Sequence, residues 1–435
     1  MLPRKEEFLE ATTLFASVVK WLVLSIFVGA VVGASTSLFL KLLSISVNFT
    51  LRFEHYYFFL PLSFLLSTFL VSKFSPEAEG HGTEKVIEAV HRRSGRIAPA
   101  VVPVKLAATI LTIATGGSCG KEGPCAQIGA GLTSILASLF RFNDKDREKL
   151  VICGISAGFS AVFGTPVAGA IFGLEVLYVG KLLYDVLFPS FVSGIISYQV
   201  ASMLGISYSY KSLVLQGFSG KLFFQAIGGG VFFGLVSFLF IEVMEVCRNI
   251  EKRINPYLRA VVGGMLVLLL AHLTSRIYLG LGVDVIDGVL SGEAPSRGAF
   301  FWKMLFTALT LSSGGSGGIV TPIFFIGVTA GHTFASLLHW DPVIFSAIGL
   351  VALLAGCANT PIAASIMAIE LFGAGIAPYA AIASIVSFII TGHRSVYPSQ
   401  ILYMPKSPSV KVKEGEEIHR VFPEVRWRRR REGEE

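Results

Sequence analysis

Four long apolar stretches determine the solvent in which this chain can fold. They cover residues 14–40, 57–73, 222–246 and 257–279. Each is long enough, or nearly so, to cross the hydrocarbon core of a bilayer as a helix. Backbone groups in lipid need hydrogen-bond partners within the protein, so these stretches are expected to be helical. Only 15% of the residues are charged, against about 25% in soluble domains, which indicates an integral membrane protein.

The positive charges predict the orientation in the membrane. The formal net charge is +7, and loops rich in Lys and Arg tend to stay on the cytoplasmic side. We therefore expect a multi-pass protein of the plasma membrane with both termini in the cytoplasm: a short segment 1–13 and a basic tail 405–435. The N-terminus has no clear cleavage site and is not read as a signal peptide. A tail of this kind is typical of a topology and lipid anchor, and no nucleic-acid partner is expected. The basic residues concentrate in one loop and in the tail: Arg248, Lys252, Arg253, Arg259, Arg426 and Arg428 to Arg431.

An internal repeat gives the organisation of the remaining chain, residues 14–404. GGSCGKEGP at 116–124 returns as GGSGGIVTP at 314–322, 198 residues later. A second pattern, Pro followed nine residues later by Glu, occurs at Pro166 and again at Pro361, 195 residues later. Two motifs in the same order at nearly the same spacing predict duplicated halves, roughly 14–205 and 215–404. Gly and Pro interrupt many apolar stretches, which predicts an all-α membrane fold of inverted repeats with tilted, broken and re-entrant helices.

Each Gly-rich motif predicts the start of a helix within the membrane. Proline is favoured in the first turn of a helix, and the preceding glycines, such as Gly120 and Gly318, allow a tight backbone with uncovered amides. Free N–H groups and the helix dipole favour an anion there. Lys121 and Gly123 belong to the same candidate site. The alternative is that the glycines only permit close helix packing, which does not explain why GGS recurs at equal distance before Pro.

Glu122 lies inside the first motif and is the candidate gate. A carboxylate at an anion-binding helix end competes with the anion for the same amides, so ionised it occupies the site and protonated it leaves. The alternative is an acid that stabilises the helix dipole, worth typically about 0.3–1 kcal/mol, but such an acid is costly at membrane depth. Glu175 and Glu370 are equivalent in the two halves, which favours a structural role in binding backbone amides. Lys105 is expected either to raise the potential of the pathway or to snorkel.

These residues resemble a known family. GKEGP at 120–124, GGIVTP at 317–322 and GHGTEKVIEA at 80–89 are similar to the three signature segments of the CLC chloride channels and exchangers, and PVK at 103–105 matches as well. The resemblance implies a homodimer with one pore in each subunit and Glu122 as the gating glutamate. It also implies that the amides of Ile319 and Val320 and the hydroxyl of Tyr397 contact the central anion, and it places His81 and Gly82 beside it.

Two departures from the family pattern leave the transport mode open. His81 stands where chloride-selective members usually have Ser and nitrate-selective members Pro, and it could donate a hydrogen bond or carry a proton. Val176 stands where many exchangers have an internal proton-relay glutamate, an acid also absent from channels, some exchangers and the fluoride-exporting branch. We expect transport of chloride or a similar small anion coupled to proton antiport. The alternatives are a passive chloride channel and a fluoride/proton antiporter. The absence of paired nucleotide-binding modules points to a prokaryotic type.

An enzyme is not expected. Gly154, Ser156 and Gly158 match the pattern GxSxG, but in a membrane helix rather than at the strand-to-helix turn that a nucleophile elbow needs. The histidines show no metal spacing, and no metal or cofactor other than a bound halide ion is predicted. The five cysteines have no framework of pairs and are read as small apolar residues.

Overall fold

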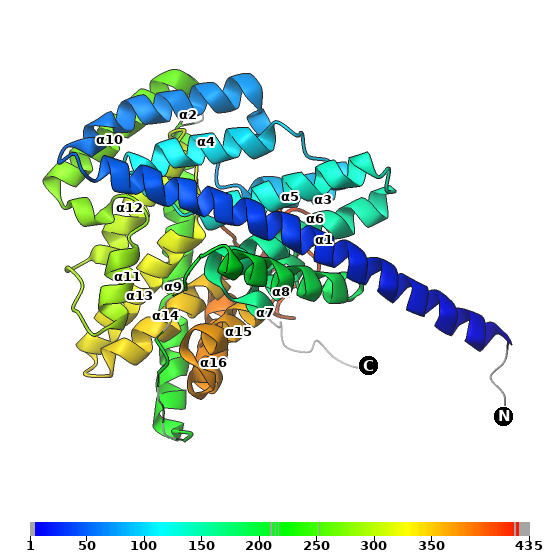
Figure 1. Ribbon diagram of the computed structural model, residues 1–435. Helices are drawn as coiled ribbons and strands as arrows, with labels where there is room; N and C mark the ends of the chain where they lie inside the picture. The colour runs from blue at the N-terminus through cyan, green and yellow to red at the C-terminus, as the bar shows by residue number, and fades with distance from the viewer. Residues whose placement is uncertain are drawn as a thin grey trace, which may run out of the picture.

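The computed structural model describes residues 5–208, 211–213, 215, 217–251, 253–421 and 423–425. The arginines of the tail from residue 426 onward, and Lys252, lie outside the described residues. The described chain is mostly helical (Figure 1), which confirms the predicted all-α class.

In the described part of the chain, eight helices form the first half, and eight counterparts follow in the same order in the second half. The first eight are α1 (Lys5–Thr50), α2 (Leu60–Phe74), α3 (Thr83–Arg93), α4 (Val101–Ala114), α5 (Glu122–Leu139), α6 (Asp144–Phe163), α7 (Pro166–Glu175) and α8 (Leu187–Met203). The second eight are α9 (Gly220–Glu251), α10 (Pro256–Leu273), α11 (Val283–Leu290), α12 (Ala299–Ser312), α13 (Val320–Leu337), α14 (Pro342–Ala358), α15 (Pro361–Phe372) and α16 (Ala377–Ile390). The halves pack on one another, with α2 beside α10 and α7 against α15 (Figure 1).

Short elements join these helices. The 3-10 turns are η1 (Tyr56–Phe59), η2 (Pro76–Ala78), η3 (Tyr184–Val186), η4 (Arg276–Tyr278), η5 (Ala374–Ile376) and η6 (Ile418–Arg420). Strand β1 (Tyr178–Val179) pairs in parallel with β2 (Ile401–Leu402), and β3 (Val410–Lys411) pairs antiparallel with β4 (Glu424–Val425). Beyond residue 404 the chain folds back: Ile418 and Val421 pack against Val179 and Leu402 in a small separate cluster.

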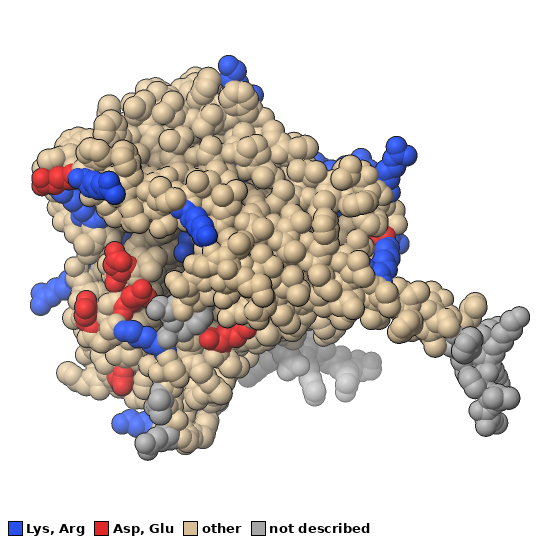
Figure 2. Space-filling view, in the orientation of Figure 1, with Lys and Arg blue, Asp and Glu red and all other residues tan. Residues whose placement is uncertain are grey.

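Six helices within the described residues are long and apolar enough to cross a membrane. They contain three of the four stretches predicted from the sequence and most of the fourth, 257–279, whose helix already ends at Leu273; Tyr184–Met203 and Val320–Leu337 are added. Helix α1 begins at Lys5 and so runs through most of the segment 1–13. Other apolar helices are too short to span, as the Gly and Pro pattern predicted. Figure 2 shows the expected consequence, a broad face around α1 with few charged side chains.

The two symmetric glutamates each close a helix end of the opposite half. The Glu175 carboxylate accepts hydrogen bonds from the amides of Ile362 (3.0 Å) and Ala363 (2.8 Å), in the first turn of α15. The Glu370 carboxylate accepts from the amides of Val167 (3.0 Å) and Ala168 (2.8 Å), in the first turn of α7. Because the first amides of a helix have no partner within it, this exchange satisfies both ends. The predicted structural role is confirmed.

We expect Glu175→Ala and Glu370→Ala each to destabilise the protein by about 2 kcal/mol, because each leaves two amides at a helix start without a charged acceptor. The larger loss should come from Glu175, whose side chain is the more buried. The midpoint of thermal unfolding in detergent measures this effect. Glu414→Ala, at an exposed site, is the control; equal midpoints for all three variants would contradict the exchange.

Candidate anion site

The two Gly-rich loops meet in the interior. Gly120 donates its amide to the carbonyl of Gly318 (2.6 Å), and Gly318 donates to the carbonyl of Gly120 (2.5 Å). Helix α5 begins at Glu122 and α13 at Val320, two residues beyond these glycines. The bridge therefore holds the N-termini of two helices from opposite halves close together, where their free amides and dipoles favour a negative guest.

Each loop is also fastened to the opposite half by a hydroxyl group. The amide of Ser118 donates to the hydroxyl of Thr310 on α12 (3.1 Å), and the amide of Ser316 donates to the hydroxyl of Thr112 on α4 (3.0 Å). These pairs keep the repeat spacing, because both Ser316 and Thr310 lie 198 residues after their counterparts. The loops are thus fixed by backbone and hydroxyl hydrogen bonds, and the Cys119 side chain of the first loop packs against Gly317 of the second.

A buried lysine stands behind each loop. Lys105 and its repeat counterpart Lys303 are fully buried, and each Nζ donates to two backbone carbonyls. The acceptors are the carbonyls of Ala78 and Gly80 for Lys105, and those of Tyr278 and Gly280 for Lys303. The amine of Lys105 is therefore held inside the protein and does not snorkel. Sequence reasoning missed Lys303, although its spacing of 198 residues from Lys105 would have found it.

Glu122 places its carboxylate on the facing helix. This side chain is fully buried, and its Oε2 accepts the amide of Thr321 (3.1 Å) while its Oε1 accepts the Thr321 hydroxyl. Thr321 lies in the first turn of α13, where an anion is expected. The carboxylate thus occupies the amide that a transported anion would use. The sequence analysis missed Thr321. Aligning the two motifs position by position places Thr321 against Gly123, so the second half supplies a hydroxyl where the first half has none.

His81 and Gly82 lie beside the start of α5, and the ring of Tyr397 lies next to that of His81. A Cβ at Gly82 would come within 2.5 Å of the carbonyl oxygen of Gly123, which shows how closely the two backbones approach. The rings of His81 and Tyr397 lie 5.5 Å apart. Neither Nδ1 of His81 nor the Tyr397 hydroxyl makes a well-formed hydrogen bond to the described residues, although the Thr83 hydroxyl lies near the latter. Unpartnered polar atoms are rare in protein interiors, and these are suited to a ligand.

The surroundings of His81 favour the neutral form of its imidazole. Burial lowers its pKa to about 3, and the positive charges of Lys105, Arg248 and Lys85 add to the effect. A neutral imidazole carries one N–H that can donate to an anion. The hypothesis that His81 carries a proton at neutral pH is therefore disfavoured, whereas hydrogen bonding to the anion stays a prediction.

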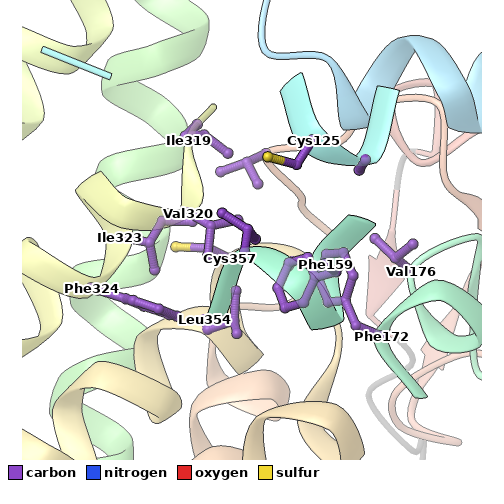
Figure 3. Close-up of a cluster of buried hydrophobic side chains, with 14 of the residues drawn as sticks. Cys125, Phe159, Phe172, Val176, Ile319, Val320, Ile323, Phe324, Leu354 and Cys357 are labelled. Carbon is purple, nitrogen blue, oxygen red and sulfur yellow. The ribbon is translucent and has the colours of Figure 1, made fainter. Parts of the chain in front are cut away.

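The other predicted residues divide into two groups. Ile319 and Val320 are buried at the start of α13, and Figure 3 shows their side chains in an apolar cluster with Cys357. This cluster leaves the backbone amides and the Thr321 hydroxyl as the polar groups at the helix end. Lys121 precedes α5 as its N-cap but is partly exposed, and its charge acts on Asp287 of α11 as well as on Cys125 of α5.

A cavity of about 530 Å³ leads to His81 from the side of the basic loop between α9 and α10. Its wall carries both signs of charge. The ionisable residues that line it are Glu79, His81, Glu84, Lys85, Glu242, Glu245, Arg248, Arg259, His393, Arg394 and His419. Four acids and four Lys or Arg residues balance one another here, so the cavity is suited to be one entrance to the site by its position against His81 rather than by its net charge.

The hydrolase pattern has no catalytic geometry. Ser156 lies fully buried within α6, and its hydroxyl donates to the carbonyl of Ala170 (3.1 Å). No cluster of potential metal ligands occurs among the residues that the structure describes.

The fold and the site define a class, a membrane transport protein whose two halves present facing helix N-termini to an anion. Residues 63–392 match the family model for voltage gated chloride channels. The chain belongs to this family, the CLC channels and antiporters, and it is an anion transporter rather than an enzyme.

Two proteins similar in sequence bear on the substrate. The chain is 35% identical over 409 residues to a chloride/fluoride channel protein of Pseudomonas syringae pv. tomato, covering 90% of this chain and 88% of the relative. It is 28% identical over 338 residues to a voltage-gated ClC-type chloride channel, ClcB, of Shigella flexneri, covering 73% and 79%.

Two solved structures share the fold. A CLC-type fluoride/proton antiporter superposes with a TM-score of 0.84 at 29% identity, covering 88% of this chain and 98% of the other. A slow cyanobacterial Cl−/H+ antiporter gives a TM-score of 0.75 at 19% identity, covering 85% and 94%. The second likeness concerns the fold alone.

We expect Gly318→Ala to lower anion flux by roughly 100-fold, because small displacements of a positioned site have effects of that size. A Cβ at Gly318 would lie 2.8 Å from the amide nitrogen of Gly123 and 3.0 Å from Glu122 Oε2, so the facing helix end must shift. Gly228→Ala is the control, since its Cβ would meet only Trp340 at 4.0 Å. Ion efflux from liposomes reports both; equal flux would contradict a site at the bridge.

Proposed function

We propose that this protein exchanges a small anion for protons across the plasma membrane and that Glu122 is both the gate and the proton carrier. The observation that carries the proposal is the position of the Glu122 carboxylate on the amide and hydroxyl of Thr321. A carboxylate bound at a helix N-terminus has taken the place of an anion.

Coupling follows from this competition. Ionised, Glu122 is held by donors at the start of α13, and an anion must displace it. Protonated, the side chain has lost its negative charge and much of its attraction for the helix end, so the anion can replace it. Anion binding and protonation of Glu122 then favour one another, whereas an ionised Glu122 excludes the anion. Alternation between these states exchanges one species for the other.

We propose fluoride, in preference to chloride, as the transported anion. The sequence favoured chloride with fluoride as the alternative, and the comparisons reverse that order: relatives are named a chloride/fluoride channel protein and a fluoride/proton antiporter. The site also supports a small anion that accepts strong hydrogen bonds. The Gly120–Gly318 bridge holds the helix ends close, and His81 offers an N–H where a Ser hydroxyl is usual in chloride-selective members.

The orientation and assembly are parts of the same proposal. The cavity wall includes Arg248 near the end of α9 and Arg259 in the first turn of α10 rather than in a loop, so we assign the cavity to the cytoplasm and expect both termini there. We expect a homodimer in the lipid bilayer, as the family resemblance implied, with bound anion in each subunit.

A passive channel is the second candidate. It is favoured by Val176, a fully buried apolar residue at the position of the internal acid of many exchangers. A channel would move anions at a rate independent of the pH gradient, and its reversal potential would follow the anion gradient alone.

Glu122→Gln should abolish proton movement and leave part of the anion movement. The amide keeps the size of the side chain but can neither ionise nor deliver a proton. Proteoliposomes with an internal pH dye and an anion electrode measure the two fluxes together. Glu88→Gln, on a partly exposed helix face, is the control, and proton-coupled flux that persists in Glu122→Gln would refute the gate.

Fluoride selectivity is tested on the wild type. We expect fluoride efflux from liposomes to drive proton uptake, and equal gradients of chloride to drive much less. His81→Ser should narrow the difference between the two anions, because it restores the hydroxyl found in chloride-selective members. Chloride efflux equal to that of fluoride in the wild type would contradict the preference.

A further inference from the structure

A proton-coupled exchanger needs a route for protons between Glu122 and the cytoplasmic cavity. The position next to Glu175 offers none. Both oxygens of Glu175 are held by amides of α15, Val176 is apolar and fully buried, and its carbonyl accepts Nε2 of Gln400 (2.8 Å). If the proposed function holds, another titratable group must lie between Glu122 and the cavity.

Glu84 has the geometry of such a group. It lies in the first turn of α3 and lines the cavity. Its Oε1 accepts the amide of Ser399 (3.0 Å) and the Ser399 hydroxyl. Its Oε2 is buried and has no hydrogen-bond partner among the described residues. Burying a carboxylate oxygen without a donor is unfavourable, whereas a proton on that oxygen removes the charge and gives the group an O–H to donate.

The placement of Glu84 connects it to the gate. Along the chain it follows His81 by three residues, and its partner Ser399 follows Tyr397 by two. The Tyr397 hydroxyl lies in the electrostatic field of both Glu122 and Glu84, and the Thr83 hydroxyl is its neighbour. Tyr397 is therefore the group through which we connect the buried gate with the carboxyl at the cavity wall.

We propose that Glu84 is the internal proton relay, which exchanges protons with water in the cytoplasmic cavity and passes them through the Tyr397 hydroxyl to and from Glu122. In the inward-loaded step, Oε2 of Glu84 takes a proton from water and releases it toward Tyr397. The Tyr397 oxygen accepts that proton as it gives up its own to the Glu122 carboxylate. Tyr397 ends unchanged, and one proton has moved from the cavity to Glu122.

The surroundings of Glu84 allow its carboxyl group both to take up and to release a proton. Helix α3 is not among the membrane-spanning helices. Burial raises the pKa of Glu84 to about 7, against the opposing effects of the Ser399 hydrogen bonds and of the charges on Arg248 and Lys85. A relay works best with a pKa near the working pH. The other ionisable groups on the same wall are His81, Glu79, Glu242, Glu245, Arg259, His393, Arg394 and His419.

The competing explanation is that Glu84 only anchors the loop that carries Tyr397. Glu84→Gln separates the two roles, because the amide oxygen can still accept from Ser399 but cannot titrate. Glu84→Ala removes both functions. Glu245→Gln is the matched control, since it neutralises another acid on the same cavity wall.

The experiment measures proton and anion flux in proteoliposomes while the pH on the cavity side is varied from about 5.5 to 8.5, across the range in which such a group titrates. In the wild type we expect coupled proton flux with a midpoint near the pKa of Glu84. Glu84→Gln should lower coupled proton flux by roughly 100-fold, the usual scale for loss of a proton-transfer group, while uncoupled anion flux remains. The control should keep both the flux and its midpoint.

Four outcomes would overturn the relay, and only the first is also failure of the proposed function. If the wild type moves no protons, the exchange itself is refuted and the relay falls with it. If the wild type couples and Glu84→Gln couples equally well, the relay alone is refuted. If Glu84→Gln and Glu84→Ala lose anion and proton flux together, or if Glu245→Gln has the same effect, Glu84 is an anchor or one charge among several.

Discussion

The reciprocal hydrogen bonds between Gly120 and Gly318 fix the arrangement on which the site depends. Two helix N-termini carry partial charges of the same sign and would not approach without restraint. The bridge, the Ser–Thr pairs and the exchange of Glu175 and Glu370 all cross between the halves, so each half completes the other. The result is a rigid cradle of backbone amides and the Thr321 hydroxyl, with Lys105 and Lys303 behind the loops, and the proposed function assigns an anion to it.

The two repeats form this cradle symmetrically, but they differ at two aligned positions, and this difference is what the proposed function uses. Aligned by the repeat, Glu122 lies opposite Val320, and Gly123 lies opposite Thr321. One helix therefore supplies the carboxylate and the other supplies the hydroxyl that receives it. Two acids at the bridge would repel one another, whereas a single acid facing a hydroxyl can occupy and vacate the same site.

Sequence periodicity and repeats predicted the parts that depend on local pattern. The apolar stretches became helices, and the symmetric spacing of Glu175 and Glu370 indicated their capping role. Thr321 and Glu84 were missed because their importance lies in contacts across about 200 and 315 residues of chain. In the sequence Glu84 is one of several charges on a polar helix, and only the fold shows that one of its oxygens is buried without a partner.

Buried polar groups in this protein are of two kinds. Those with hydrogen-bond partners stabilise the fold, and those that keep an unpartnered atom are the ones that the proposed transport uses. Lys105 and Lys303 have two carbonyl partners each, and such satisfied groups hold the fold in one state. His81, Tyr397 and Glu84 each keep a polar atom without a well-formed partner, and His81 and Glu84 line the cavity. In the proposed function the anion would reach the bridge past His81 and the proton would pass Tyr397 beside it, so both ions would use one narrow passage. The anion and the proton must then pass one after the other. The competition between the ionised Glu122 carboxylate and the anion for the same donors imposes this order.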